Sequence, residues 1–216
     1  MPANAVVPQS LDEHLVLLGG IAPDRVHQSP SPGTATMADC LTAQSEGKPC
    51  ELVDGKLVDK AMGMYESLLA CCLIRLFGAA AGEGKMGIVS GEQGFIRLPS
   101  GQVRAPDVAF YLWRNLPGGR MPPDPVPEVV PDIAVEIVSK GNTMAEMANK
   151  RREYFAAGTA IVWMLDPVAR TVAVYTPASR HTIVDTHQTL DGGDVLPNLE
   201  IQLTRLFAEV DGQLKA

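Results

Sequence analysis

A strand–helix–strand order over residues 132–166 constrains the fold more than any other feature of the chain. "DIAVEIVS" is an apolar run of strand length, "NTMAEMANKRREYFAAG" has helical spacing and ends at Gly158, and "AIVWMLDP" is a second apolar run. Two strands that are joined through a helix run parallel in one sheet. A run that is apolar on both faces also predicts a central strand covered on both sides. We therefore expect a parallel pair at the centre of a covered sheet.

One residue interrupts the first of these strands. Because strand residues alternate between faces, Glu136 shares its face with Ala134 and Val138, which are both apolar. An unpaired ionised carboxylate in such a place costs several kcal/mol or raises its own pKa. The segment alone leaves two readings open. Glu136 lies at a wet strand end or pairs with an arginine, or it holds a cation such as a metal ion.

A second carboxylate interrupts "VRAPDVAFYL" in the same way. Asp107 follows Pro106, which cannot donate to a ladder and therefore indicates a sheet edge, a strand start or a bulge. Taken alone, the Pro-Asp pair is more simply explained as turn chemistry. Asp132, at the start of the next strand, is fully explained in that way.

Two further residues complete the candidate set. Lys150 lies at the edge of the apolar face of the helix that follows Glu136, from which its long side chain can reach the sheet. Arg151 and Arg152 follow it, so an ordinary solvated basic face is the alternative. Glu51 stands in "CELVDGKLV", just before a hairpin turn, where an exposed charge is the simpler expectation.

The first 33 residues differ in composition from the rest. Residues 1–33 are rich in Pro, Gly and small residues, and they predict an extension or arm with one short helix that Gly19 and Gly20 end. The body is expected over residues 34–210 as one domain. Its length suits one full core.

The body begins with a helix, a hairpin and a long helix. "ATMADCLTAQSEG" predicts a helix capped by Thr34 or Thr36, and "CELVDGKLVDK" predicts a hairpin that turns at Asp54–Gly55. Strand, turn, strand, turn and strand follow over residues 85–113, and a strand at "RTVAVYT" and a short strand or helix close the chain. The long helix has apolar residues at helical spacing, namely Leu68, Leu69, Cys72, Leu73, Leu76 and Phe77.

Charge and cysteine content limit the classes of function. The net charge of -7 and pI of about 5.1 make the chain a poor default candidate for nucleic-acid binding, although one basic face remains compatible with them. No secretory signal and no apolar run of membrane-spanning length is visible. No CxxC spacing occurs, so we expect the four cysteines, Cys40, Cys50, Cys71 and Cys72, to be reduced core residues of a cytoplasmic protein.

Two carboxylates that project from neighbouring strands suit a hard divalent cation. Mg²⁺ takes oxygen ligands, keeps several waters, and can activate one of them against a phosphodiester. The sequence contains no HExxH, Walker loop, GxSxG or GxGxxG motif, and its four histidines are scattered. A zinc hydrolase and a serine triad therefore have no support.

Five segments in order resemble the Uma-two family of restriction endonuclease-like proteins, which belongs to the PD-(D/E)XK nuclease superfamily. They are "CELVDGKLV", "VRAPDVAF", "PDIAVEIVSKGNT", "NKRREYFAAG" and "IVWMLDPVARTVAVY", and the similarity covers about residues 34–207. The resemblance implies an α/β, restriction-endonuclease-like fold of three layers, in which helices flank a mixed central sheet. It also implies endonuclease activity on DNA with Mg²⁺ or Mn²⁺ as cofactor, and a homodimer.

The resemblance also assigns roles to individual residues. Asp107, Glu136 and the main-chain carbonyl of Ile137 correspond to metal ligands. The superfamily lysine two residues after the glutamate is replaced by Val138, and the family resemblance moves this role to Lys150 on the following helix. Glu51 corresponds to an early acid that binds metal through water or holds Lys150.

Two other classes of function stay open at this stage. The negative charge and the lack of an attached DNA-reading domain favour a catalytically silent binding or regulatory module that keeps the fold. An arm that exchanges between subunits would instead indicate a homo-oligomeric assembly protein. The leading expectation is a Mg²⁺-dependent DNA endonuclease that acts without contact to a membrane.

Overall fold

The computed structural model describes residues 10–177 and 181–213. The first nine residues of the predicted arm lie outside these ranges. In the described part of the chain, no helix is both long and apolar enough to cross a bilayer.

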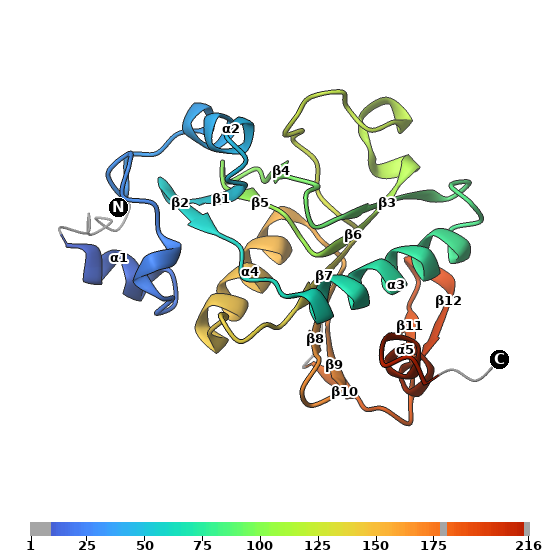
Figure 1. The fold of residues 1–216 in the computed structure, drawn as a ribbon. Helices are drawn as coiled ribbons and strands as arrows, with labels where there is room; N and C mark the ends of the chain where they lie inside the picture. The colour runs from blue at the N-terminus through green and yellow to red at the C-terminus, as the bar shows by residue number, and fades with distance from the viewer. Residues whose placement is uncertain (1–9, 178–180, 214–216) are drawn as a thin grey trace.

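A mixed sheet of six strands forms the centre of the fold (Figure 1). Its order is β10-β9-β8-β7-β6-β3, in which β7 and β8 run parallel and the other neighbours run antiparallel. The parallel pair is joined through helix α4 (Met144–Ala157), so the predicted crossover is confirmed. The strands are β3 (Gly87–Gly91), β6 (Val108–Leu112), β7 (Ile133–Ile137), β8 (Ile161–Asp166), β9 (Thr171–Tyr175) and β10 (Thr182–Val184).

Helices cover both faces of this sheet, which gives three layers. Helix α3 (Met64–Ala80) packs on one face, where Phe77 meets the ring of Trp163 edge-on at 5.3 Å between centroids. Helix α4 packs on the other face through Met147 and Tyr154. Because the strands alternate, β7 sends Ile133, Val135 and Ile137 towards α3 and leaves Ala134 and Glu136 on the α4 side. Glu136 therefore faces α4.

The C-terminal elements complete the α3 layer. The hairpin of β11 (Thr189–Gly192) and β12 (Leu196–Gln202) packs with α5 (Leu203–Val210) against α3. The expected short strand or helix near the end is thus both, in succession. In the long proline-rich loop, two short 3-10 turns, η2 (Trp113–Asn115) and η3 (Pro117–Gly119), come first. The side-chain hydrogen bonds of Asp132 are not the local bonds of the expected turn chemistry: Asp132 accepts from the Leu112 N–H and the Asn115 side chain, 20 and 17 residues away along the chain.

A second, smaller sheet has four strands. Its order is β2-β1-β5-β4, with β1 (Cys50–Val53), β2 (Lys56–Asp59), β4 (Ile96–Arg97) and β5 (Val103–Arg104). Helix α2 (Met37–Ser45) packs on it and begins with a capping box at Thr36, one of the two predicted caps. The hairpin turns at Asp54 and Gly55, both with positive φ, as predicted.

The single strand expected across "VRAPDVAFYLW" is wrong. The segment forms two strands in two different sheets, β5 before Pro106 and β6 after Asp107. Proline has no N–H to continue a ladder, so the backbone leaves one sheet and enters the other at this point. This break places Asp107 at the junction of the two sheets.

Two expectations about the long helix are corrected. Leu68 is 45% exposed, and Cys71 is exposed rather than part of the core. The buried stripe of α3 runs through Leu69, Ala70, Leu73 and Phe77, which leaves Leu68 and Cys71 beyond its edge. All four cysteines are free thiols, as expected, and Cys40 and Cys50 are buried.

The N-terminal segment is tied to the body. Helix α1 (Leu11–Leu17) is followed by η1 (Pro23–Arg25), and a small apolar cluster joins this segment to β1 and β2. The guanidinium of Arg25 donates to both carboxylate oxygens of Glu146 at 2.8 and 3.0 Å and to the carbonyl of Asp59. The division of the chain at residues 33 and 34 stays a prediction.

Candidate active site

Asp107 lies directly before β6, and Glu136 belongs to the neighbouring strand β7. β6 and β7 pair antiparallel with Val108 opposite Val135, and one more step of the same register brings Asp107 opposite Glu136. The exposed fractions of these two residues are only 3% and 2%. Oδ2 of Asp107 accepts a hydrogen bond from the Ile137 N–H at 2.7 Å. The two predicted carboxylates therefore lie at one end of the β6–β7 pair.

Helix α4 brings two donors to Glu136. A capping box between Thr143 and Glu146 defines the start of the helix, and Lys150 and Tyr154, four residues apart, share one face of it. The Lys150 ammonium donates to Oε2 of Glu136 at 2.9 Å, and the Tyr154 hydroxyl donates to Oε1 at 2.6 Å. Both carboxylate oxygens are engaged. Helical spacing by itself assigns Tyr154 to the apolar face of α4 and does not indicate the polar role of its hydroxyl.

Glu51 is buried, in contrast to the exposed charge that its place beside a hairpin suggested. Only 1% of the residue is exposed, and the side chain reaches from β1 towards α4. Its carboxylate lies 3.3 Å from the ammonium of Lys150 and accepts from Arg104 at 2.8 Å and from the Ala105 N–H at 3.2 Å. The second sheet thus contributes an acid that faces the same lysine as Glu136.

Arg104 is a member of this network that the sequence did not reveal. Its guanidinium donates to Glu51 and, through two further bonds at 2.6 and 2.8 Å, to Glu153 of α4. Such paired contacts between a guanidinium and a carboxylate are among the stronger polar contacts in proteins. The one available signal was its place three residues before Asp107. Arg104 links the second sheet to α4 behind the site.

Lys60 is the second residue that was missed. It follows β2, where no periodic pattern marks it. Its ammonium donates to Oδ1 of Asp107 at 2.8 Å and to the carbonyl oxygens of Ala105 at 2.6 Å and Glu92 at 3.3 Å. The side chain is 13% exposed. A positive charge thus lies among three oxygens beside one of the predicted metal ligands.

The burial of these charges shifts their pKa values in different directions. Burial by itself raises the pKa of the Glu51 carboxyl, but the cations of Lys150 and Arg104 outweigh it and lower that pKa to about 2. Burial likewise opposes the charge of Lys150, yet Glu136 and Glu51 raise its pKa above the ordinary value. Burial raises the pKa of Glu136, and the charge of Asp107 adds to that rise against the pull of Lys150. Added positive charge at this place would therefore favour the ionised form of Glu136.

The donors present fit a hard divalent cation. Among the described residues, no group of three or more His, Cys, Asp or Glu side chains is arranged to hold a metal. Two carboxylates and one main-chain carbonyl form a smaller set of oxygen donors, of the kind that Mg²⁺ uses when it keeps several waters. The three oxygens around the Lys60 ammonium demonstrate that this place already holds a cation. The ligand roles of Asp107, Glu136 and Ile137 are not tested by these contacts and stay predictions.

Comparison with protein-family models tests the family resemblance that the five sequence segments indicated. Residues 37–204 match the Uma2 (Uma-two) model, which is described as "Putative restriction endonuclease". The chain belongs to the Uma2 family. The Uma2 region starts at the first residue of α2 and includes every residue of the candidate site. No curated protein sequence matches the chain.

The Uma2 chain also resembles solved structures. One is the crystal structure of a "putative nuclease belonging to DUF820" from Anabaena variabilis, with a TM-score of 0.67 and 18% sequence identity. The similarity covers 75% of this chain and 91% of that one. At this identity the comparison concerns the fold, and the expected restriction-endonuclease-like fold with a mixed, helix-flanked sheet is confirmed.

Proposed function

We propose that the protein is a divalent-metal-dependent endonuclease that hydrolyses phosphodiester bonds of DNA. The observation that carries the proposal is the pair of buried carboxylates formed by Asp107, directly before β6, and Glu136 of the neighbouring strand β7. Membership of a family described as restriction endonucleases supplies the class of reaction. Mg²⁺ or Mn²⁺ is the expected cofactor.

Asp107, Glu136 and the carbonyl of Ile137 would hold the metal. When bound, such an ion supplies a Lewis acid for the phosphate and lowers the pKa of a bound water. The surrounding residues orient the carboxylates. Tyr154 and Lys150 fix both oxygens of Glu136, and Glu51 fixes Lys150 in turn. In this arrangement Lys150 and Glu51 act as positioning residues: Lys150 holds the Glu136 carboxylate and favours its ionised form, and Glu51 holds Lys150.

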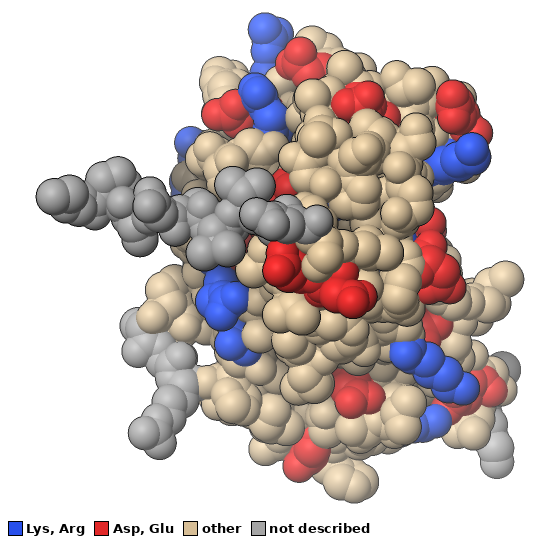
Figure 2. All heavy atoms as spheres, turned by 90° about the vertical axis from the view of Figure 1, so that its left-hand side faces the viewer, with Lys and Arg blue, Asp and Glu red and all other residues tan. Residues whose placement is uncertain are grey.

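A groove lies next to these residues and includes Lys60. It has a volume of about 610 Å³ and is lined by residues 60–66, which include the start of α3, and by residues 139–141, which follow β7. Lys60 belongs both to this groove and to the charge network of Asp107. On the face drawn in Figure 2, the described Lys and Arg side chains are scattered among acidic ones and form no single basic surface. We assign the DNA backbone to the groove because Lys60 both lines it and pairs with Asp107.

Cleavage of plasmid DNA with Mg²⁺ or Mn²⁺ tests the proposal. We expect the wild type to cut, and Asp107→Asn and Glu136→Gln to cut more slowly by on the order of 100-fold, since loss of a ligand is at least as harmful as loss of its supporting contacts. Asp124→Asn is the matched control, because Asp124 is exposed in the proline-rich loop. Equal rates for all four proteins, or no metal-dependent cutting by the wild type, would contradict the proposal.

A catalytically silent nuclease-fold module is the second candidate. It is favoured by the fact that each carboxylate of the site already has a cationic partner, which is sufficient for a purely structural network. Isothermal titration calorimetry separates the two candidates. Binding of Mn²⁺ that is lost in Asp107→Asn supports the enzyme, and no heat of binding in the wild type supports the silent module.

Three further features belong to the proposal and have their own tests. A homodimer would place two sites on the two strands of a duplex, and sedimentation of the full chain measures its mass. The same experiment on a chain without residues 1–33 tests the assembly role of the predicted arm, because an unchanged mass argues against it. We also propose a cytoplasmic location, which cell fractionation checks.

A further inference from the structure

The two lysines of the site have different surroundings. Lys150 is 3% exposed and lies between Glu136 and Glu51, with the Arg104 guanidinium bound to the other oxygen of Glu51. Lys60 is 13% exposed, and it lines the open groove together with Ser139. Of these two ammonium groups, only that of Lys60 has a path to a molecule in the groove.

The Lys60 ammonium has one charged partner and two neutral ones. One partner is the Asp107 carboxylate, and the other two are the neutral carbonyl oxygens of Ala105 and Glu92. A lysine side chain has a flexible four-carbon stem, so its charged end can change partners while the stem stays packed. A metal ion and the Lys60 ammonium on the same carboxylate would repel each other strongly, because the interaction energy of two partly buried charges about 4 Å apart is several kcal/mol.

We propose that Lys60 exchanges partners during the reaction and contacts the phosphate of the substrate. In the metal-free protein its ammonium neutralises Asp107. When a divalent cation is bound at Asp107, the ammonium turns into the groove and binds a phosphate oxygen of the DNA. This inference rests on the proposed function. It assigns the substrate-facing lysine to Lys60 and leaves Lys150 as the positioning residue of Glu136.

If Lys60 exchanges partners, the Lys60→Met substitution should change the affinity for metal and the affinity for DNA in opposite directions. In Lys60→Met, a metal no longer competes with an ammonium for Asp107, so the affinity for Mn²⁺ measured by calorimetry should rise by about tenfold, the equivalent of one charged hydrogen bond. The affinity for DNA should fall. A lysine with only a structural role would weaken both. Lys60→Arg keeps the charge and should restore DNA binding.

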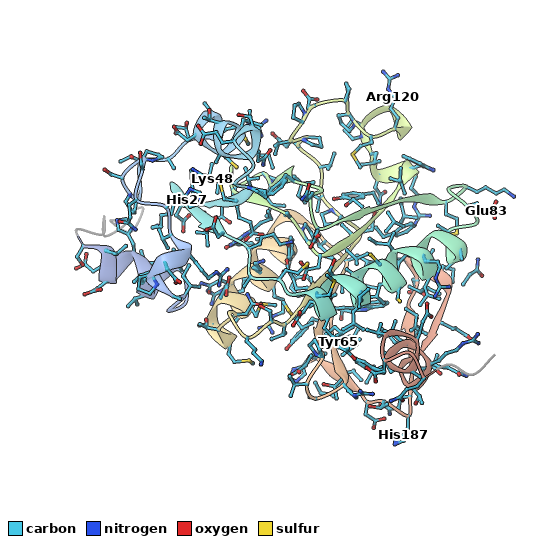
Figure 3. All side chains as sticks on the ribbon, in the orientation of Figure 1. His27, Lys48, Tyr65, Glu83, Arg120 and His187 are labelled. Atoms are coloured by element: carbon cyan, nitrogen blue, oxygen red, sulfur yellow. The ribbon has the colours of Figure 1, made fainter. Side chains whose placement is uncertain are left out.

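Salt dependence identifies the phosphate contact. Binding of a labelled duplex is followed by fluorescence anisotropy in Ca²⁺, which shares the preference for oxygen ligands. Loss of one phosphate contact lowers the slope of log affinity against log salt by about 1, and we expect this change in Lys60→Met. Lys48→Met is the control. Lys48 follows α2 and lies far from Tyr65, a residue of the groove, as Figure 3 shows. The Lys48→Met variant should therefore leave both the salt slope and the metal affinity unchanged.

A measurement on the wild type covers the case in which Lys60→Met does not fold. Acetylation of lysines is followed by peptide mass spectrometry, with Lys48 as internal reference. The rate at Lys60 should rise at least about threefold when Mn²⁺ is added, and it should fall again when duplex DNA is added to the metal-loaded protein. An unchanged rate at Lys60 in a protein that binds Mn²⁺ overturns the inference.

The outcomes separate this inference from the function on which it rests. A wild type that neither binds Mn²⁺ nor cuts DNA overturns the proposed function and the exchange with it. A wild type that binds Mn²⁺ and cuts DNA, together with a Lys60→Met variant of unchanged metal affinity and salt slope, overturns the role of Lys60 alone.

Discussion

The Lys150 ammonium lies 2.9 Å from Oε2 of Glu136, although the two residues are 14 positions apart and belong to a helix and a strand. The contact is buried and is shared with Glu51, so one cation serves two acids from two different sheets. Four consequences of this network and its surroundings can be measured.

Removal of the shared cation should strongly destabilise the fold. Lys150→Met leaves the buried carboxylates of Glu136 and Glu51 without their common partner, and breaking a buried pair in this way costs about 3–5 kcal/mol. Urea unfolding measures the loss. Lys140→Met, at an exposed position in the turn after β7, should change stability by less than about 0.5 kcal/mol. Equal stability of the two variants would show that the Lys150 contacts contribute nothing.

Loss of the tyrosine hydroxyl should cost less than loss of the lysine. Tyr154→Phe keeps the ring but leaves Oε1 of Glu136 without its donor, which corresponds to about 1–3 kcal/mol for a buried acceptor. Thermal unfolding gives the difference. Tyr175→Phe is the comparison, because the contacts described for Tyr175 are through its ring, which lies under the Arg151 guanidinium. A larger loss in Tyr175→Phe than in Tyr154→Phe would contradict the reading.

Acid should weaken the fold through Glu51. Its pKa is lowered from 4.5 to about 2 in the folded chain, so the unfolded chain takes up the proton first as pH falls. The resulting stabilisation, roughly 3 kcal/mol, is fully present above pH 4.5 and is lost as pH falls from 4.5 towards 2. Urea midpoints across this range should fall less steeply in Glu51→Gln. Parallel pH profiles for the two proteins would exclude this origin.

The N-terminal segment should detach when its ion pair is removed. Arg25 bonds to Glu146 and to two backbone carbonyls, so Arg25→Met breaks the polar attachment of η1 to α4. Limited proteolysis should then cut before residue 34 at least about threefold faster than in wild type. Arg120→Met, at an exposed position labelled in Figure 3, should be cut at the wild-type rate. An unchanged rate in Arg25→Met would assign the attachment to the apolar cluster and to the remaining polar contacts, which join Gly19 to Thr143 and Leu17 to Asn149.

Local patterns were sufficient for most of the elements. Helical spacing, the Thr36 cap and the left-handed Gly158 predicted α2, α3 and α4 close to their observed bounds, because caps and periodicity act within a few residues. The same patterns wrongly predicted that Leu68 is buried, because the width of the buried stripe on a helix depends on which elements pack against it. They also predicted one strand across Pro106, where the chain passes from one sheet to another.

The sequence by itself determined the parallel crossover, the family and the residue types of the site. Only the tertiary structure decided which charges meet. Glu51, Arg104 and Lys60 come from the second sheet and its margin. Their contacts with Lys150, Glu153 and Asp107, respectively, depend on how two sheets and a helix pack together. Patterns within a short stretch of sequence do not predict such long-range packing. A lysine after a hairpin and a lysine on a helix look alike in sequence, and burial makes one a structural cation and leaves the other beside an open groove.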